Sequence, residues 1–212
     1  MRRVFTDAAA PHRDAIEEAA TWIRDGGVVA IPTDTLYGLA VDPFSRSAVA
    51  RLFDVKRREP DRAVPLIAAD RAQVEAHLGA LDPLAARLAE RFWPGPLTLL
   101  VPAPAALANG VAGPNGRVGV RVPGDAIARR VCAAAGRPVT ATSANISGAE
   151  ATADPEIVER TLGGAIDLLL DAGPVPGGRP STIIDTLEGT PRVIRAGAIE
   201  WGEISAWLQQ HA

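Results

Sequence analysis

The feature that most constrains the fold is an alternation of short apolar runs with amphipathic helical patterns along the chain. Residues 11–25 carry apolar side chains at the spacing of one helical face, and Gly26 and Gly27 end that pattern. The apolar run 28–31 follows directly and predicts a buried strand. Because helical and strand patterns mingle in this way without an internal repeat, the sequence predicts an α/β fold.

The later segments continue this alternation. Further helices are predicted at 71–78, 83–92, 125–135, 155–162 and 200–210, together with one that starts at Ser45 or Ser47 and whose last turn carries residues 56–58. Further strands are predicted at 64–68, 97–101, 118–122, 139–142, 167–170, 182–185 and 192–195. The close spacing of the later strands favours a mixed sheet, so we expect one twisted, mostly buried mixed sheet flanked by helices.

Length and composition fit a single domain over 1–212. Of the 212 residues, 47% are hydrophobic and 22% charged, which is enough apolar material for a substantial core. No long Ser/Gly linker divides the chain, and the Pro/Gly-rich stretches 102–116 and 173–180 are expected to be surface loops. The second stretch leads straight into Ser181 and is the better candidate for a lid.

Several classes of protein are disfavoured. A net charge of −3 gives no general attraction to nucleic acid or anionic membranes, and the single cysteine, Cys132, excludes an internal disulfide framework and fits a buried, inert thiol. The N-terminus lacks the apolar core of a secretory signal, so a cytoplasmic location is expected. The uncharged stretch 92–116 does not predict a membrane span, because it is interrupted by Pro94, Pro96, Pro102, Pro104 and Pro114.

Six short segments join strand-like runs to hydroxyls or fixed cations, at 32–38, 56–58, 118–123, 142–148, 181–185 and 193–195. Hydroxyls and cationic side chains are the groups with which proteins hold phosphates and carboxylates, so these strand ends together would form a site for anionic substrates. Arg121 stands between two valines, where an arginine needs an anionic partner or an exposed face, and Arg195 poses the same question.

Each segment also has a structural interpretation. The cations at 56–58 can complement a helix dipole, and the Pro-Thr-Asp-Thr segment can be a turn that bonds its own backbone. Ser143, Asn145 and Ser147 can likewise cap a loop. Taken alone, none of these signals decides between the structural and the functional interpretation.

Common catalytic classes do not fit the chain. Residues 173–178 have the outer glycine spacing of a P-loop, but Arg179 and Pro180 follow where Lys and Ser/Thr are required. The three histidines show no metal-binding spacing, and Ser143 lacks the Gly-x-Ser-x-Gly elbow of a hydrolase. Cations and hydroxyls without a covalent nucleophile remain, and such a set suits adenylyl transfer from ATP.

The six segments, in this order, resemble the threonylcarbamoyl-AMP synthase family (YrdC-type domain) over residues 12–200. The resemblance implies a YrdC-like enzyme that converts L-threonine, bicarbonate or CO2, and ATP into threonylcarbamoyl-AMP and pyrophosphate. It implies as partner a tRNA-modifying threonylcarbamoyl transferase complex that acts on the adenosine beside the anticodon. Some members carry a C-terminal regulatory domain, whereas this chain ends with the predicted helix 200–210 and is expected to be the catalytic domain alone.

The resemblance also implies residue roles. Threonine would be bound by Thr35, Arg121, Ser143 and Ser181, with Tyr37 packed beside the pocket. ATP would be bound by Lys56, Arg58, Asn145, Arg195, Arg117 and Thr152, of which Lys56 and Arg58 would also be catalytic by stabilising charge on the departing pyrophosphate. The chain departs from the common family pattern at Val64 and Ala69, in the strand region that follows Arg58.

Mg²⁺ is expected to accompany ATP rather than to occupy a protein-ligated metal site, because the sequence shows no clustered carboxylates.

Two alternative functions stay open. One is a domain that forms carbamoyl-adenylate from carbamoyl phosphate, as in related longer proteins. The other is a double-stranded RNA-binding module, and weak RNA binding by the site cations is compatible with the synthase as well.

Overall fold

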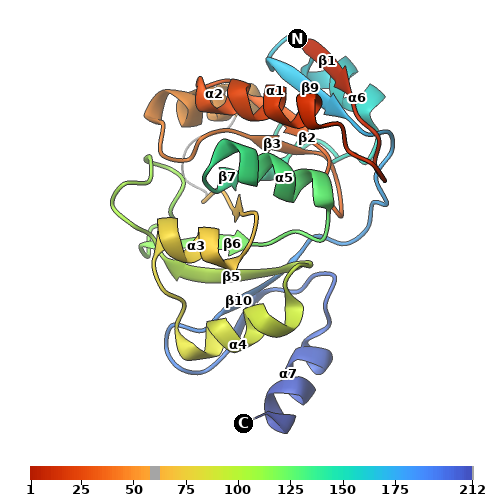
Figure 1. Ribbon diagram of the computed structural model, residues 1–212. Coiled ribbons are helices and arrows are strands. Elements are labelled where there is room, and N and C mark those ends of the chain that lie inside the picture. Colours follow the sequence, from red (N-terminus) through yellow and green to blue (C-terminus); the bar gives the residue numbers. More distant parts are fainter. Residues whose placement is uncertain (58–62, 212) are drawn as a thin grey trace.

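The computed structural model describes residues 1–57 and 63–211 and contains two mixed β-sheets with helices packed around them (Figure 1). The helices described are α1 (Arg13–Arg24), α2 (Arg46–Lys56), α3 (Arg71–Leu78), α4 (Pro83–Phe92), α5 (Ala126–Ala135), α6 (Pro155–Leu162) and α7 (Trp201–Gln210). The predicted fold class, an α/β fold with mixed β-structure flanked by helices, is confirmed. The strands, however, are divided between two sheets rather than gathered in one.

The first sheet has the strand order β1-β9-β2-β3-β8. Its strands are β1 (Arg2–Phe5), β9 (Leu168–Asp171), β2 (Val29–Ile31), β3 (Gly38–Ala40) and β8 (Thr142–Ser143). β1 and β2 run parallel to β9, whereas β3 runs antiparallel to β2 and β8. Both β1 and β3 were missed from the sequence, because β1 is a polar edge strand and β3 is a three-residue segment of small and apolar residues.

The second sheet has the order β11-β10-β5-β6-β4-β7. Its strands are β11 (Arg192–Arg195), β10 (Thr182–Asp185), β5 (Leu97–Pro102), β6 (Arg117–Arg121), β4 (Leu66–Ile67) and β7 (Val139–Thr140). The single strand predicted over 139–142 is wrong: β7 and β8 belong to different sheets. The chain crosses from one sheet to the other at Ala141, whose amide donates to the Pro65 carbonyl at 2.8 Å.

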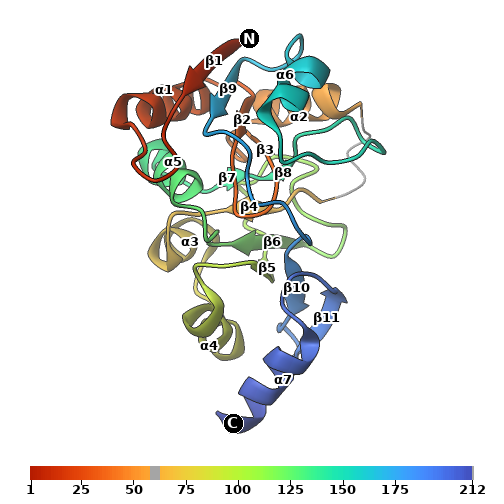
Figure 2. The same cartoon turned by 90° about the vertical axis from the view of Figure 1, so that its right-hand side faces the viewer.

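Apolar packing joins the layers. A large core between the two sheets contains Tyr37, Leu39, Leu66 and Val120, while α1 and α5 cover the outer side of β2 and β9 through Ile23 and neighbouring residues. A third cluster joins α4 and α7 to β5 and β10. The termini lie at opposite ends of the molecule, with β1 at one end and α7 at the other (Figure 2).

The starts of several helices are fixed by capping side chains and by prolines in the first turn. Ser45 caps α2, and Asp70, Asp82 and Asp154 accept backbone hydrogen bonds at the starts of α3, α4 and α6. Proline occupies the first turn of α4 and α6, where its missing N–H costs nothing. Among the described residues, no helix has the length and apolar character that crossing a membrane requires.

Candidate active site

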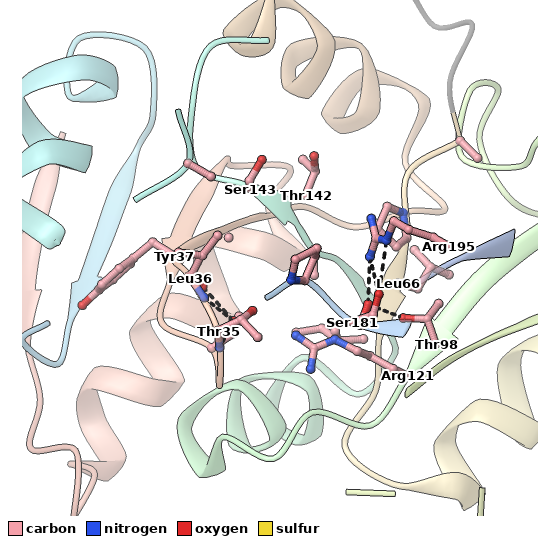
Figure 3. Close-up of a pocket in the computed structure, with 18 residues that line it drawn as sticks. Thr35, Leu36, Tyr37, Leu66, Thr98, Arg121, Thr142, Ser143, Ser181 and Arg195 are labelled. Carbon is pink, nitrogen blue, oxygen red and sulfur yellow. Dashed lines mark hydrogen bonds between the residues drawn. The ribbon is translucent and has the colours of Figure 1, made fainter. Parts of the chain in front are cut away.

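A cavity of about 500 Å³ lies where the two sheets meet (Figure 3). The first sheet contributes the turn between β2 and β3 together with β8, and the second contributes residues of β4, β5, β6 and β11 and the residue before β10. Of the predicted site residues, the cavity wall includes Thr35, Arg121, Ser143, Ser181 and Arg195. The fold therefore brings five of the ten predicted site residues to one place from positions up to 160 residues apart in the chain.

The Pro-Thr-Asp-Thr segment forms the turn on one side of the cavity. The Thr33 hydroxyl donates to the Leu36 carbonyl at 2.7 Å and lies 3.3 Å from the Thr35 hydroxyl. This local bonding matches the turn interpretation of the motif, yet it also holds Thr35 at the cavity wall. The structural and functional interpretations of this segment are therefore compatible.

Arg121 ends β6 and is paired with Asp34 of the same turn. Its Nη1 donates to Asp34 Oδ1 at 2.6 Å, and Asp34 Oδ2 accepts from the Gly124 amide at 3.1 Å. Only 7% of the surface of Arg121 is exposed, so the pair lies largely out of bulk water. The sequence indicated that Arg121 needs an anionic partner or an exposed face. The structure supplies the partner, Asp34, which lies 87 residues earlier and was not identified from the sequence.

Ser181 and Arg195 meet on the opposite wall. Arg195 Nη2 donates to the Ser181 hydroxyl at 3.0 Å, and its Nε and Nη2 donate to the Ser181 carbonyl at 3.2 and 2.8 Å. The Thr98 hydroxyl of β5 lies 2.8 Å from the Ser181 hydroxyl. Figure 3 shows these side chains together with Arg121 on one side of the cavity and the Thr35 turn on the other. Thr98 was not singled out from the sequence.

The two arginines influence one another. Burial lowers the pKa of the Arg195 guanidinium from its ordinary value, and the nearby charge of Arg121 lowers this pKa further. Arginine nevertheless stays charged in proteins. Two guanidinium groups in one cavity, with only Asp34 paired directly to one of them among the described residues, therefore favour an anionic ligand.

Lys56 ends α2 and is buried, with 3% of its surface exposed. Its ammonium donates to the Ser143 carbonyl at 2.7 Å, the Asn145 carbonyl at 2.9 Å and Asn145 Oδ1 at 3.0 Å. The ammonium thus holds the segment that follows β8, beside the cavity rather than in its wall. Its predicted contact with ATP stays a prediction.

Lys56 is also the only lysine among the 22 Lys and Arg residues of the chain. A compact ammonium has three protons in a tetrahedral arrangement, which suits three oxygen acceptors converging from different directions, whereas a planar guanidinium does not. This composition signal is a second sequence feature that marks Lys56, beside the family resemblance.

The segment after β8 is tightly bonded. The Ser143 hydroxyl donates to Asn145 Oδ1 at 2.6 Å, and Asn145 Nδ2 donates to the Ala149 carbonyl at 2.6 Å. The Asn145 bond to the backbone agrees with the capping interpretation of that residue, whereas the Ser143 hydroxyl bonds a side chain and Ser143 lies on the cavity wall. Asn145 itself is outside the wall.

The other predicted ATP residues are placed differently. Arg117 is ion-paired with Asp185, outside the cavity wall, and Thr152 is buried, with its carbonyl accepting from the Tyr37 amide at 3.0 Å. Arg58 lies outside the described residues. Tyr37 is buried beside the cavity as expected, and its hydroxyl donates to the Gly173 carbonyl at 2.8 Å.

The two departures from the family pattern are not at the wall. Val64 is a core residue, and the Ala69 amide donates to Gln73 Oε1 at 2.9 Å. Their neighbours Pro65, Leu66 and Ile67 supply apolar wall instead.

Cys132 is buried, and its pKa is raised to about 12 mainly by that burial, which fits the expected inert thiol. In the part of the chain that is described, no group of three His, Cys, Asp or Glu side chains could hold a metal ion.

The fold and site define an α/β protein with a cationic, hydroxyl-lined cavity between two mixed sheets. The Sua5/YciO/YrdC family model, described as telomere recombination, matches residues 21–197, and the chain belongs to this family. The family resemblance identified from the sequence is thereby confirmed.

Named relatives agree with this membership. A threonylcarbamoyl-AMP synthase of Pyrococcus abyssi is 36% identical over 197 residues, covering 91% of this chain and 58% of that protein. A threonylcarbamoyl-AMP synthase of Coxiella burnetii is 33% identical over 178 residues, covering 84% of this chain and 96% of its own length. The chain thus spans little more than half of the P. abyssi relative but nearly all of the C. burnetii one.

Solved structures show the same fold. The crystal structure of P. abyssi Sua5 complexed with L-threonine superposes with a TM-score of 0.91 at 33% identity, covering 97% of this chain and 60% of that one. Escherichia coli YciO gives a TM-score of 0.81 at 27% identity, covering 93% of this chain and 95% of its own. HypF gives 0.74 at 23% identity, covering 86% of this chain and 29% of its own, and shows the fold alone.

Proposed function

We propose that this chain is an L-threonylcarbamoyladenylate synthase, which forms threonylcarbamoyl-AMP and pyrophosphate from L-threonine, bicarbonate or CO2, and ATP. The observation that carries the proposal is the cavity wall formed by Arg121, Arg195 and Ser181 opposite the Thr35 turn. This wall offers fixed positive charge and hydroxyls to a small polar anion. The names of the relatives and the L-threonine complex of P. abyssi Sua5 support the choice of substrate.

The threonine carboxylate is proposed to bind Arg121, Arg195 and Ser181. Guanidinium groups suit carboxylates because their donors lie in a planar fork. Arg121 is already held through Nη1 by Asp34, so its remaining donors are preorganised for the ligand. Thr35 and Ser143, on the first sheet, then complete the threonine site from the facing wall.

ATP is proposed to lie along the segment after β8, near Asn145 and Thr152, with Arg195 shared between the two substrates. Lys56 supports this wall by holding the carbonyls of Ser143 and Asn145, and it adds positive charge beneath it. Arg58 and Arg117 are proposed as further phosphate contacts. Since Arg117 is paired with Asp185, it would have to leave that ion pair to reach ATP.

The reaction needs charge stabilisation and alignment rather than a protein nucleophile. The threonine amine bonds to the carbon of CO2 and loses a proton to solvent, giving a carbamate. A carbamate oxygen then bonds to the α-phosphorus of ATP while the bond to pyrophosphate breaks. The cations named above would hold the carboxylate and counter the charge that builds on pyrophosphate.

Mg²⁺ is proposed to enter with ATP, on whose phosphates it would counter negative charge. The cavity wall presents hydroxyls and guanidinium groups, which suit phosphate and carboxylate oxygens better than a bare cation. We also propose that the chain forms a single catalytic domain that acts in the cytoplasm. Its product would be passed to a tRNA-modifying threonylcarbamoyl transferase complex, and the site cations would bind RNA at most weakly.

The decisive experiment measures pyrophosphate release by the purified protein with ATP, threonine and bicarbonate together, and with each omitted in turn. Release that requires all three supports the synthase. Release that requires carbamoyl phosphate instead indicates the carbamoyl-adenylate alternative. No release, together with RNA binding that ATP does not displace, favours the RNA-binding alternative.

A further inference from the structure

Thr98 lies directly behind Ser181 in the cavity wall. It belongs to β5, which pairs in parallel with β10, and only 1% of its surface is exposed. Its hydroxyl lies 2.8 Å from that of Ser181. Gly119 of the neighbouring strand β6, whose register partner is Leu100, leaves room for Thr98, since a Cβ atom on Gly119 would lie 3.0 Å from Thr98 Cγ2. The sheet is therefore built to admit a threonine at this position.

The direction of the hydrogen bond between the two hydroxyls follows from counting protons. Ser181 Oγ already accepts from Arg195 Nη2 at 3.0 Å and has a second lone pair for Thr98. Among the described residues, the Thr98 hydroxyl has no hydrogen-bond partner other than Ser181. If Ser181 donated to Thr98, the buried proton of Thr98 would have no acceptor, which costs free energy. Donation from Thr98 to Ser181 avoids that cost.

With both lone pairs of Ser181 occupied, its own proton has one direction left, which is the cavity. We propose that Thr98 is a positioning residue that aims the Ser181 hydroxyl at the carboxylate of the amino-acid substrate. This inference rests on the proposed function, in which Ser181 binds threonine. Ser181 then joins Arg121 and Arg195 as a third donor to the carboxylate.

The test replaces the Thr98 hydroxyl by a methyl group of similar size. In Thr98→Val, the Ser181 hydroxyl loses the hydrogen bond that it accepts from Thr98. Its proton can then turn toward other acceptors or water, so the hydroxyl is no longer held in one orientation. We expect the KM for L-threonine to rise about tenfold at saturating ATP and bicarbonate, with kcat changed less than twofold. Thr98→Ser keeps the hydroxyl and is expected to keep the KM within twofold of the wild-type value.

A double-mutant cycle separates this role from a general effect on the fold. In the Ser181→Ala background, Thr98→Val is expected to leave the KM unchanged, because the group that it positions is gone. Thr186→Val is the matched control: Thr186 is another buried threonine, beyond the end of β10, whose hydroxyl donates to Asp82 Oδ2 at 2.6 Å outside the cavity. It is expected to change thermal stability but not the KM for threonine.

The proposal is overturned if Thr98→Val has the wild-type KM, if Thr98→Ser raises the KM as much as Thr98→Val, or if Thr98→Val keeps its full effect without the Ser181 hydroxyl. If Thr98→Val does not fold, Thr98→Ala, which also removes the hydroxyl, takes its place in the same comparisons, and a wild-type KM in that variant would likewise overturn the proposal. Failure of the proposed function would be seen separately, as absence of threonine-dependent pyrophosphate release in the wild-type protein.

Discussion

Replacement of Lys56 by arginine tests whether the only lysine of the chain is required as an ammonium. The exchange preserves charge, and arginine supplies the other 21 of the 22 Lys and Arg residues of the sequence. At position 56, however, the three acceptors on Ser143 and Asn145 lie 2.7, 2.9 and 3.0 Å from one nitrogen atom. A longer planar group in this buried space can satisfy about one of them.

The magnitude follows from these bonds. Hydrogen bonds to charged groups contribute roughly 1.5–3 kcal/mol each, and an oversized buried side chain adds roughly 1–3 kcal/mol of strain. Relaxation of the segment after β8 recovers part of this, so we expect a net loss of about 3 kcal/mol in the free energy of unfolding. For a chain of this size, 1 kcal/mol shifts Tm by roughly 2–4 °C, which gives a decrease of about 6–12 °C.

Differential scanning calorimetry of Lys56→Arg measures this shift directly. The control is Arg46→Lys, the reverse exchange at an exposed position on the same helix, for which we expect a Tm within about 1 °C of wild type. Pyrophosphate release should also fall in Lys56→Arg, because the part of the cavity wall formed by Ser143 is displaced. A Tm for Lys56→Arg within about 2 °C of wild type would refute the argument from ammonium geometry.

Three further predictions concern other sites. Gly197→Ala would place its Cβ within overlap of the Pro180 carbonyl and the backbone of Ser181, so we expect a loss of about 3 kcal/mol by calorimetry and a raised KM for threonine; normal values of both would contradict the close approach. Arg57→Gly should stabilise the protein by about 0.5–1 kcal/mol in urea unfolding, because Arg57 ends α2 at φ 49° where glycine has no steric penalty, and a lower midpoint would count against this. Cys132 should react with a disulfide reagent at pH 8 only after denaturation, since burial raises the pKa of its thiol to about 12 and shields the sulfur from the reagent; rapid native labelling would be inconsistent with its burial.

Elements with strong local signals could be predicted from the sequence. The helices α3, α4 and α6 have the predicted bounds, because Asp70, Asp82 and Asp154 mark their starts. The strands β10 and β11 also match residue for residue. The division into two sheets could not be predicted, since it depends on which strands pair across long separations and on the crossing at Ala141.

The same distinction applies to the candidate site. The segments that carry Thr35, Arg121, Ser143, Ser181 and Arg195 stand out in the sequence because polar groups follow apolar runs, and all five line the cavity. Their partners could not be found in this way. Asp34 reaches Arg121 and Thr98 reaches Ser181 only after the strands are assembled, and neither pairing leaves a local pattern.

The division into two sheets also explains how the site obtains its charge. A guanidinium buried within one continuous sheet would need a permanent partner for all of its donors. Replacing that partner by a ligand anion would then cost the free energy of breaking a buried ion pair. Here Arg121 ends a strand of the second sheet, while its partner Asp34 comes from a turn of the first, so the pair spans the gap between them. Asp34 engages one guanidinium nitrogen, and the cavity beside it admits a ligand to the others. Because the site lies where the two sheets meet, the fold can hold two arginines close together and still leave some of their donors accessible to an anionic substrate.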